Sequence, residues 1–109
     1  MEQNINNIDF SKGDGTVPVI VQDANTKEIL TLAYSNKESL ERTVASGNSW
    51  FWSRSRRKLW MKREESGNTQ KVRKVLVDCD SDALIYLVEP EGPACHTGER
   101  TCFHNSLKN

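Results

Sequence analysis

The chain has 109 residues, which is long enough for one domain with a modest core and too short for two. Its composition, 36% hydrophobic and 28% charged, is ordinary for a soluble protein, and no apolar run approaches the roughly 20 residues of a membrane span. The N-terminal stretch MEQNINNIDF has no basic region followed by an apolar one, as a signal peptide would need. We therefore expect a single domain over residues 1–109, located in the cytoplasm and without contact to a membrane.

The first third of the chain predicts a loop and then a hairpin. Residues 1–15 are polar and end in Gly13-Asp14-Gly15, which is typical of a loop. The stretches VPVIVQD (17–23) and EILTLAY (28–34) predict two paired strands, and Asn25-Thr26 between them suits a turn.

A helix is predicted over residues 36–46. Ser35 or Asn36 fits its N-cap, and Gly47 is suited to end it. Leu40 and Val44 stand at the i, i+4 spacing that lies on one helix face.

The second half predicts a further run of strands. These are SWFWSRS (49–55), TQKVRKVLVDCD (69–80) and ALIYLVEP (83–90), with a turn at Gly67-Asn68. Together with the first hairpin they indicate an α+β fold with a mostly antiparallel sheet and one clear helix.

The net charge of zero hides a basic segment. Residues 54–74 contain nine Lys and Arg against two Glu, a net charge of +7, and the rest of the chain carries −7. Such a concentration of positive charge favours a bound anion. The simpler explanation, a solvated basic edge strand that discourages aggregation, fits the charge equally well.

VDCDSDA (77–83) places three aspartates two residues apart. If the strand continues through them, Asp78, Asp80 and Asp82 share one face and Cys79 points to the other. Three carboxylates that close repel one another unless a cation lies among them. The spacing also matches an EF-hand loop, but Ala83 stands where that loop needs Gly and neither flank is helical, so an EF-hand is excluded.

Three cysteines, Cys79, Cys95 and Cys102, are an odd number and cannot form a complete disulfide framework. As zinc ligands they leave one position open. His96 or His104 in that position would make a closed structural site, and water would make a catalytic one. Three unrelated cysteines remain an alternative, since the spacing matches no zinc-finger pattern.

Three ordered motifs then point to a family. FWSRSRRKLWMKREESGNTQ (51–70), VDCDSDA (77–83) and GPACHTGERTCF (92–103) closely resemble phosphoribosyl-AMP cyclohydrolase, an enzyme of histidine biosynthesis, over nearly the whole chain. The one clear departure is Arg63, where the family pattern has Gly. Because the chain ends at Asn109, we expect the monofunctional form, without the fused pyrophosphohydrolase domain that some members carry.

The resemblance implies a hydrolase that opens the adenine ring of phosphoribosyl-AMP between N1 and C6. It assigns Cys79, Cys95 and Cys102 to zinc, with the fourth position left for a water whose pKa the metal lowers to about 7. His96 follows a ligand directly and suits a general base, with a fourth ligand or a surface histidine as the competing interpretations. His104 is the weaker candidate.

The resemblance also implies magnesium and a substrate site. Asp78, Asp80 and Asp82 are the expected magnesium ligands, because a hard cation prefers oxygen. Arginine forks and serine hydroxyls of the basic segment suit the two phosphates of the substrate, and further residues match the family motif. The expected substrate-binding residues are Ser53, Arg54, Ser55, Arg56, Lys62, Glu64, Ser66 and Gln70. Trp50, Trp52 and Trp60 suit either stacking on the base or the core.

For assembly, the resemblance implies an intertwined homodimer with zinc ligands from both chains, a small nucleotide as substrate and no nucleic acid. The alternative from another class is a zinc-stabilised nucleic-acid-binding module, with aromatic residues interleaved in a basic strand pair. The acidic DCDSD stretch opposes that alternative, because it would repel a polyanion.

Overall fold

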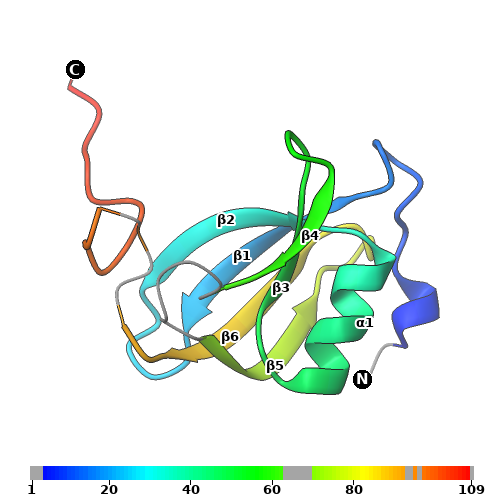
Figure 1. Ribbon diagram of the computed structural model, residues 1–109, viewed down its shortest axis with the longest axis horizontal. Helices are drawn as coiled ribbons and strands as arrows, with labels where there is room; N and C mark the ends of the chain where they lie inside the picture. The colour runs from blue at the N-terminus through cyan, green and yellow to red at the C-terminus, as the bar shows by residue number, and fades with distance from the viewer. Residues whose placement is uncertain (1–3, 63–69, 93–94, 96, 109) are drawn as a thin grey trace.

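The computed structural model describes residues 4–62, 70–92, 95 and 97–108. The elements follow in the order η1 Ile5–Asn7, β1 Val17–Asp23, β2 Ile29–Ser35, α1 Lys37–Ser46, β3 Trp50–Ser53, β4 Lys58–Met61, β5 Gln70–Val77 and β6 Leu84–Pro90. Figure 1 shows α1 packed beside the sheet, with the β3–β4 hairpin rising above it and the C-terminal tail at the far end. In the described part of the chain, no helix has the length and apolar character needed to cross a membrane.

Four strands form one sheet in the order β2-β1-β6-β5. β1 runs antiparallel to β2 and β5 antiparallel to β6, whereas β1 and β6 are parallel. The strands β3 and β4 pair in a separate two-stranded sheet. The predicted α+β class with a mostly antiparallel sheet and one clear helix is confirmed for the described residues.

Local signals fix the ends of α1. Asn36 accepts the Ser39 N–H at 2.9 Å and Ser39 Oγ accepts the Asn36 N–H at 2.9 Å, which is a reciprocal N-cap. Gly47 ends the helix with φ of 78°, a left-handed conformation that favours glycine. Leu40 is buried, whereas Val44, four positions further along the helix, is 58% exposed.

The core lies on one face of the large sheet. Alternate residues of β1 and β6 point into it, as period-2 strand geometry requires. The buried members are Val17, Val19, Val21, Leu84, Tyr86 and Val88 from the sheet, with Leu30, Ile8, Leu40 and Phe51 from outside β1 and β6. The rings of Phe51 and Tyr86 lie 5.8 Å apart, so the β3–β4 hairpin is anchored to the sheet through an aromatic contact.

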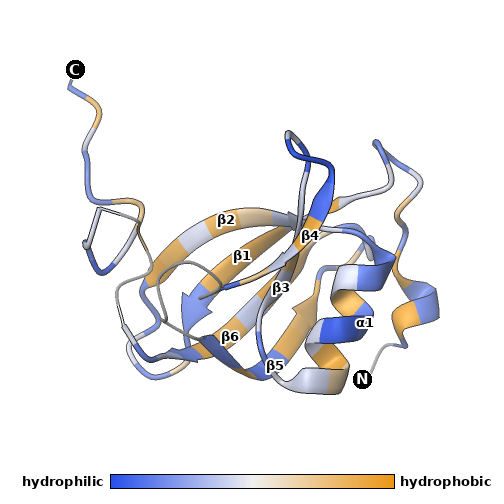
Figure 2. Cartoon of the chain, viewed as in Figure 1, coloured by the Kyte–Doolittle hydropathy of each residue, from blue (hydrophilic) through white to orange (hydrophobic). Residues whose placement is uncertain are grey.

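The opposite face of the sheet carries an apolar row. The register aligns Leu32, Ile20, Ile85 and Leu76 in one row across all four strands. Leu32 is 47% exposed and the other three are half-buried. Figure 2 shows the strands coloured mostly as hydrophobic, while the tip of the β3–β4 hairpin is strongly hydrophilic. We call this row the apolar sheet face.

Candidate metal and substrate site

Two of the cysteines form a close pair in the loop after β6. A tight turn holds Cys95: the Gly98 N–H donates to the Cys95 carbonyl at 3.0 Å, and the Cys95 N–H donates to the Glu99 carbonyl at 3.2 Å. The hydroxyl of Thr97 donates to Cys95 Sγ at 3.0 Å. That hydrogen bond, with smaller contributions from the Cys102 side chain and the charge of His104, lowers the pKa of Cys95. The loop therefore favours a thiolate at the buried Cys95 next to a second thiol.

Cys102 is held against the edge strand β2. Its N–H donates to the Leu30 carbonyl at 2.7 Å, and the hydroxyl of Thr101 donates to the Ile29 carbonyl at 2.6 Å. The ring Nδ1 of His104 lies 2.9 Å from the Thr101 carbonyl oxygen, which holds the imidazole near the pair. His96 lies outside the described residues.

Cys79 lies at the other end of the sheet. It sits in the turn before β6, whereas Cys95 follows the end of β6. A seven-residue strand spans about 20 Å. Figure 1 shows the two segments at opposite ends of the sheet, the turn before β6 in yellow and the cysteine loop in orange. Among the described residues, no group of three or more His, Cys, Asp or Glu gathers in a way that could hold a metal ion.

The three aspartates lie in a turn, so the prediction that they share one strand face is wrong. β5 ends at Val77 because Asp78 Oδ1 accepts the backbone N–H groups of Asp82, at 2.9 Å, and Ala83, at 3.2 Å. These bonds lower the pKa of Asp78. Ser81 adopts φ of 59°, which completes the reversal of the chain. The carboxylates are thereby confined to a short loop rather than spread along a strand.

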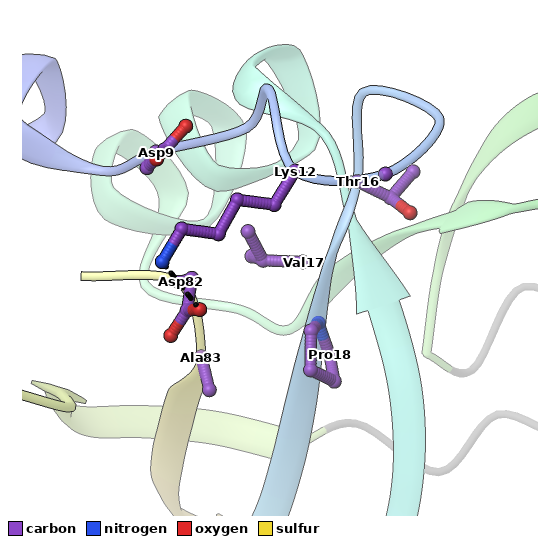
Figure 3. A pocket seen from close by; sticks show the side chains of 8 residues that line it. Asp9, Lys12, Thr16, Val17, Pro18, Asp82 and Ala83 are labelled. Atoms are coloured by element: carbon purple, nitrogen blue, oxygen red, sulfur yellow. Dashed lines mark hydrogen bonds and ion pairs between the residues drawn. The ribbon is translucent and has the colours of Figure 1, made fainter. Parts of the chain in front are cut away.

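Each of the other two carboxylates has a partner as well. Asp80 Oδ1 accepts from Cys79 Sγ at 3.5 Å, and this contact and the negative charge of Asp80 raise the pKa of Cys79. Asp82 Oδ2 pairs with Lys12 Nζ at 3.0 Å. Figure 3 shows Lys12 reaching from the N-terminal loop across a pocket of about 300 Å³ to Asp82. The ammonium group of Lys12 thus pairs with Asp82, one of the expected magnesium ligands.

The β3–β4 hairpin presents the arginines. Arg54 follows β3, with its guanidinium 4.1 Å from the centre of the Tyr34 ring and its Nε 3.4 Å from Asp14 Oδ2. Ser53 Oγ accepts the Arg56 N–H at 3.2 Å and shapes the turn. Ser55, Arg54 and Arg56 are exposed at the hairpin tip, where an anion in solution can reach them.

The remaining expected substrate residues fall at the base of this hairpin or beyond it. The Lys62 N–H donates to the Ser49 carbonyl at 3.0 Å, and the Ser49 N–H donates to the Gln70 carbonyl at 3.1 Å. Gln70 is 1% exposed, and neither polar atom of its side chain has a partner among the described residues. A buried amide is costly without a hydrogen bond. Glu64 and Ser66 lie outside the described residues.

Two of the three tryptophans have clear packing contacts. Trp60 packs against the core with its ring 4.8 Å from that of Phe51. Trp50 is half-buried beneath the guanidinium of Arg42, 5.0 Å from the ring centre. The core role that the sequence allowed is thus observed for Trp60, and stacking on the base stays a prediction.

Several residues around the site were not predicted from the sequence. Lys12 and Asp14 reach it from the N-terminal loop, and Arg100 links the cysteine loop to Asp23 at 2.7 Å. Their partners are 40 to 77 positions away in the chain, and hydrophobic periodicity does not predict contacts of that kind.

Comparisons with known proteins agree on one family. The family model of phosphoribosyl-AMP cyclohydrolase matches residues 31–104. The phosphoribosyl-AMP cyclohydrolase of Cenarchaeum symbiosum is 75% identical over 98% of the chain and 99% of that protein. The enzyme of the same name from Nitrosopumilus maritimus is 72% identical over 99% of the chain and all of that protein. The histidine biosynthesis bifunctional protein HisIE of Thermus thermophilus is 63% identical over 85% of the chain but only 44% of its own length.

Proposed function

We propose that this chain, which belongs to the phosphoribosyl-AMP cyclohydrolase family, hydrolyses the N1–C6 bond of the adenine ring of phosphoribosyl-AMP in histidine biosynthesis, and that it requires zinc and magnesium. The observation that carries the proposal is the match over nearly the full chain to relatives of that name, at up to 75% identity. The cysteine pair, the aspartate turn and the arginine-bearing hairpin then supply the chemistry that the reaction needs.

Cys95 and Cys102 fit zinc by the chemistry of their donors. They are neighbouring thiols, and the surroundings of Cys95 already favour its thiolate. Cys79 of the same chain, about 20 Å away along β6, cannot join them. Cys79 of a second chain would complete the set. When bound, zinc would supply the Lewis acidity that lowers the pKa of a water to about 7.

A homodimer follows from this ligand set, and the apolar sheet face offers the surface for it. A partly exposed apolar row across four strands is typical of a surface that another protein covers. A two-fold axis between two such faces, running across the strands, reverses one sheet relative to the other. That arrangement brings the Cys79 end of one chain toward the cysteine-pair end of its partner. We therefore propose a homodimer with two shared zinc sites.

Magnesium fits the aspartate turn by the same test of donor chemistry. Asp78, Asp80 and Asp82 offer hard oxygen donors within five residues, and magnesium usually needs only one or two protein carboxylates together with substrate phosphates. Asp82 becomes available when Lys12 releases it. The exposed pair between them is weak enough for a divalent cation to replace.

The hairpin binds the phosphates in this proposal. Arg54 and Arg56 present guanidinium forks that suit phosphate oxygens, and the hydroxyls of Ser53 and Ser55 lie beside them. Arg54 is held by Asp14 without substrate, so a phosphate takes the place of that carboxylate. Lys62, Glu64, Ser66 and Gln70 complete the expected substrate contacts, and the side chain of Gln70 is only 1% exposed.

The chemical step moves both protons of one water. Water adds through its oxygen to C6 and the C6–N1 bond breaks; one proton goes to the exocyclic nitrogen, an imine in the neutral N1-substituted ring, and the other goes to N1, so that C6 becomes the carbon of a carboxamide. His96 suits this transfer as the general base, because the unperturbed pKa of histidine, near 6.5, allows it to accept and return a proton at neutral pH.

The free thiols of all three cysteines fit a reducing compartment, and we place the enzyme in the cytoplasm.

The test is turnover of phosphoribosyl-AMP by the purified chain, with zinc content measured on the same sample. Cys95→Ser should lose bound zinc and nearly all activity, because a hydroxyl is a far poorer zinc ligand than a thiolate. Ser106→Ala, in the exposed C-terminal segment, is the matched control and should change neither. A Cys95→Ser protein with full zinc and normal turnover would show that the assignment is wrong.

A further inference from the structure

Arg100 ties the cysteine loop to the β1–β2 hairpin through three side-chain hydrogen bonds. Its Nη2 donates to Asp23 Oδ2 at 2.7 Å and to Thr26 Oγ1 at 3.3 Å, and its Nε donates to Glu28 Oε1. All three partners belong to the β1–β2 turn or its flanks. One planar guanidinium therefore joins the cysteine loop to the turn of the β1–β2 hairpin.

Asp23 makes this contact more than a surface ion pair. Its side chain is 5% exposed, while that of Arg100 is 52% exposed. Its Oδ1 accepts the N–H groups of Asn25 at 2.8 Å and Thr26 at 3.1 Å, so that oxygen is committed to the turn. The other oxygen, Oδ2, faces Arg100. Removing the cationic partner of a buried carboxylate costs folding free energy, whereas breaking a fully exposed ion pair costs little.

The position of Arg100 in the loop gives the contact its consequence. Arg100 directly follows the turn from Cys95 to Glu99, and it directly precedes Thr101 and Cys102, which hydrogen-bond to β2. The segment that carries Cys95 and the segment that carries Cys102 thus meet at Arg100. A change in how Arg100 is held shifts one segment relative to the other and changes the distance between the two thiols.

We propose that Arg100 is a positioning residue for zinc: its fork on Asp23 and Glu28 fixes the cysteine loop so that Cys95 and Cys102 are spaced for the metal before it binds. The inference rests on the proposed zinc site. Holding ligands in place in advance lowers the ordering cost of binding, and partners that orient metal ligands typically account for 10- to 100-fold in affinity. Lysine, a point charge without the fork, would serve this role only in part.

The test measures zinc affinity by competition with a chromophoric chelator, on the purified full chain. Arg100→Met keeps a side chain of similar length without charge, and we expect its zinc Kd to rise about 10- to 100-fold. Arg100→Lys should recover part of that loss. Arg73→Met, which removes the exposed pair with Glu89 at 3.1 Å on the edge strand β5, is the matched control and should bind zinc as the wild type does.

A second readout separates positioning from general stability. With cobalt in place of zinc, the visible spectrum reports the geometry of the thiolates, so Arg100→Met should alter that spectrum at full cobalt loading. Should Arg100→Met fail to fold, Glu28→Gln removes the exposed partner instead and should raise the zinc Kd by a smaller factor. Unchanged zinc affinity in Arg100→Met, or in Glu28→Gln where that variant stands in, overturns the role of Arg100 alone. Wild-type protein that takes up no zinc overturns the zinc site and this role together.

Discussion

The separation of Cys79 from Cys95 and Cys102 leads to a prediction about mixed dimers. A Cys79→Ser chain lacks the ligand at one end of its sheet, and a Cys95→Ser chain lacks one at the other. Neither variant alone should bind zinc, because every shared site in its homodimer has a serine. In a mixed dimer, one of the two sites combines the intact Cys79 of one chain with the intact cysteine pair of the other.

The magnitude follows from counting sites. Random reassociation of equal amounts makes about half of the dimers mixed, and each mixed dimer has one intact site of two, so about one quarter of wild-type zinc and activity should return. Isolating the mixed dimer through two different affinity tags should raise this to about one half. The assay is zinc per chain by elemental analysis, with turnover of phosphoribosyl-AMP on the same samples.

A second pair of variants serves as the control. Mixing Cys95→Ser with Cys102→Ser should restore nothing, because the two residues act as one pair from the same chain and no combination leaves that pair intact. If the mixture of Cys79→Ser and Cys95→Ser also stays without zinc while mixed dimers form, the ligands are not shared between chains. The dimer that we propose would then lose its main support.

Three further predictions concern magnesium, the general base and the dimer surface. Asp80→Asn should weaken magnesium dependence and activity but leave zinc content unchanged. The substitution removes the charge that raises the pKa of Cys79 and therefore does not oppose the thiolate form of that ligand. Loss of zinc with an intact magnesium response would mean that the two sites are exchanged. His96→Asn should keep zinc and lower kcat by about 10²–10⁴-fold, with the acidic limb of the kcat/KM profile lost; survival of that limb in zinc-replete protein would assign it to another group. Leu32→Glu should produce monomers without zinc by analytical ultracentrifugation and elemental analysis, whereas Val44→Glu, at a position on α1 that is also exposed, should remain a dimer. A dimeric, zinc-loaded Leu32→Glu protein would rule out the apolar sheet face as the interface.

The parts of the fold that were predictable are those with local causes. Asn36 and Gly47 set the ends of α1 through a cap and a left-handed residue, both visible in the sequence. The strand at Val17–Asp23 has its predicted bounds because its alternating apolar residues face a core. The parallel pairing of β1 with β6 joins residues more than 60 positions apart and has no local signal.

The wrong predictions also have physical reasons. The predicted strand over residues 69–80 is too long at its end. Strand-forming residues lead into VDCDSDA, but the Asp78 carboxylate competes for backbone N–H groups and forms a turn. The i, i+4 spacing of Leu40 and Val44 does not mark the buried face of α1, which consists of Ser39, Leu40 and Thr43. Small buried hydroxyls such as Ser39, 2.6 Å from the Ser35 hydroxyl, satisfy each other and allow close approach.

The residues of the candidate site are named by the resemblance over three motifs, and their roles stay a prediction. The sequence puts Cys79 on a strand and the other two thiols in a loop, but the distance between them follows only from the fold. Long-range ion pairs such as Arg100 with Asp23 depend on how the loops are packed, and sequence periodicity carries no information about them.

The most direct test of the central claim is a titration of zinc into metal-free protein, with magnesium present and ring opening of phosphoribosyl-AMP followed at each step. Our account predicts that activity rises in proportion to added zinc and reaches its plateau at about one zinc per chain, because each dimer holds two shared sites. Full turnover by the metal-free protein, or a zinc-saturated dimer without turnover, would contradict it.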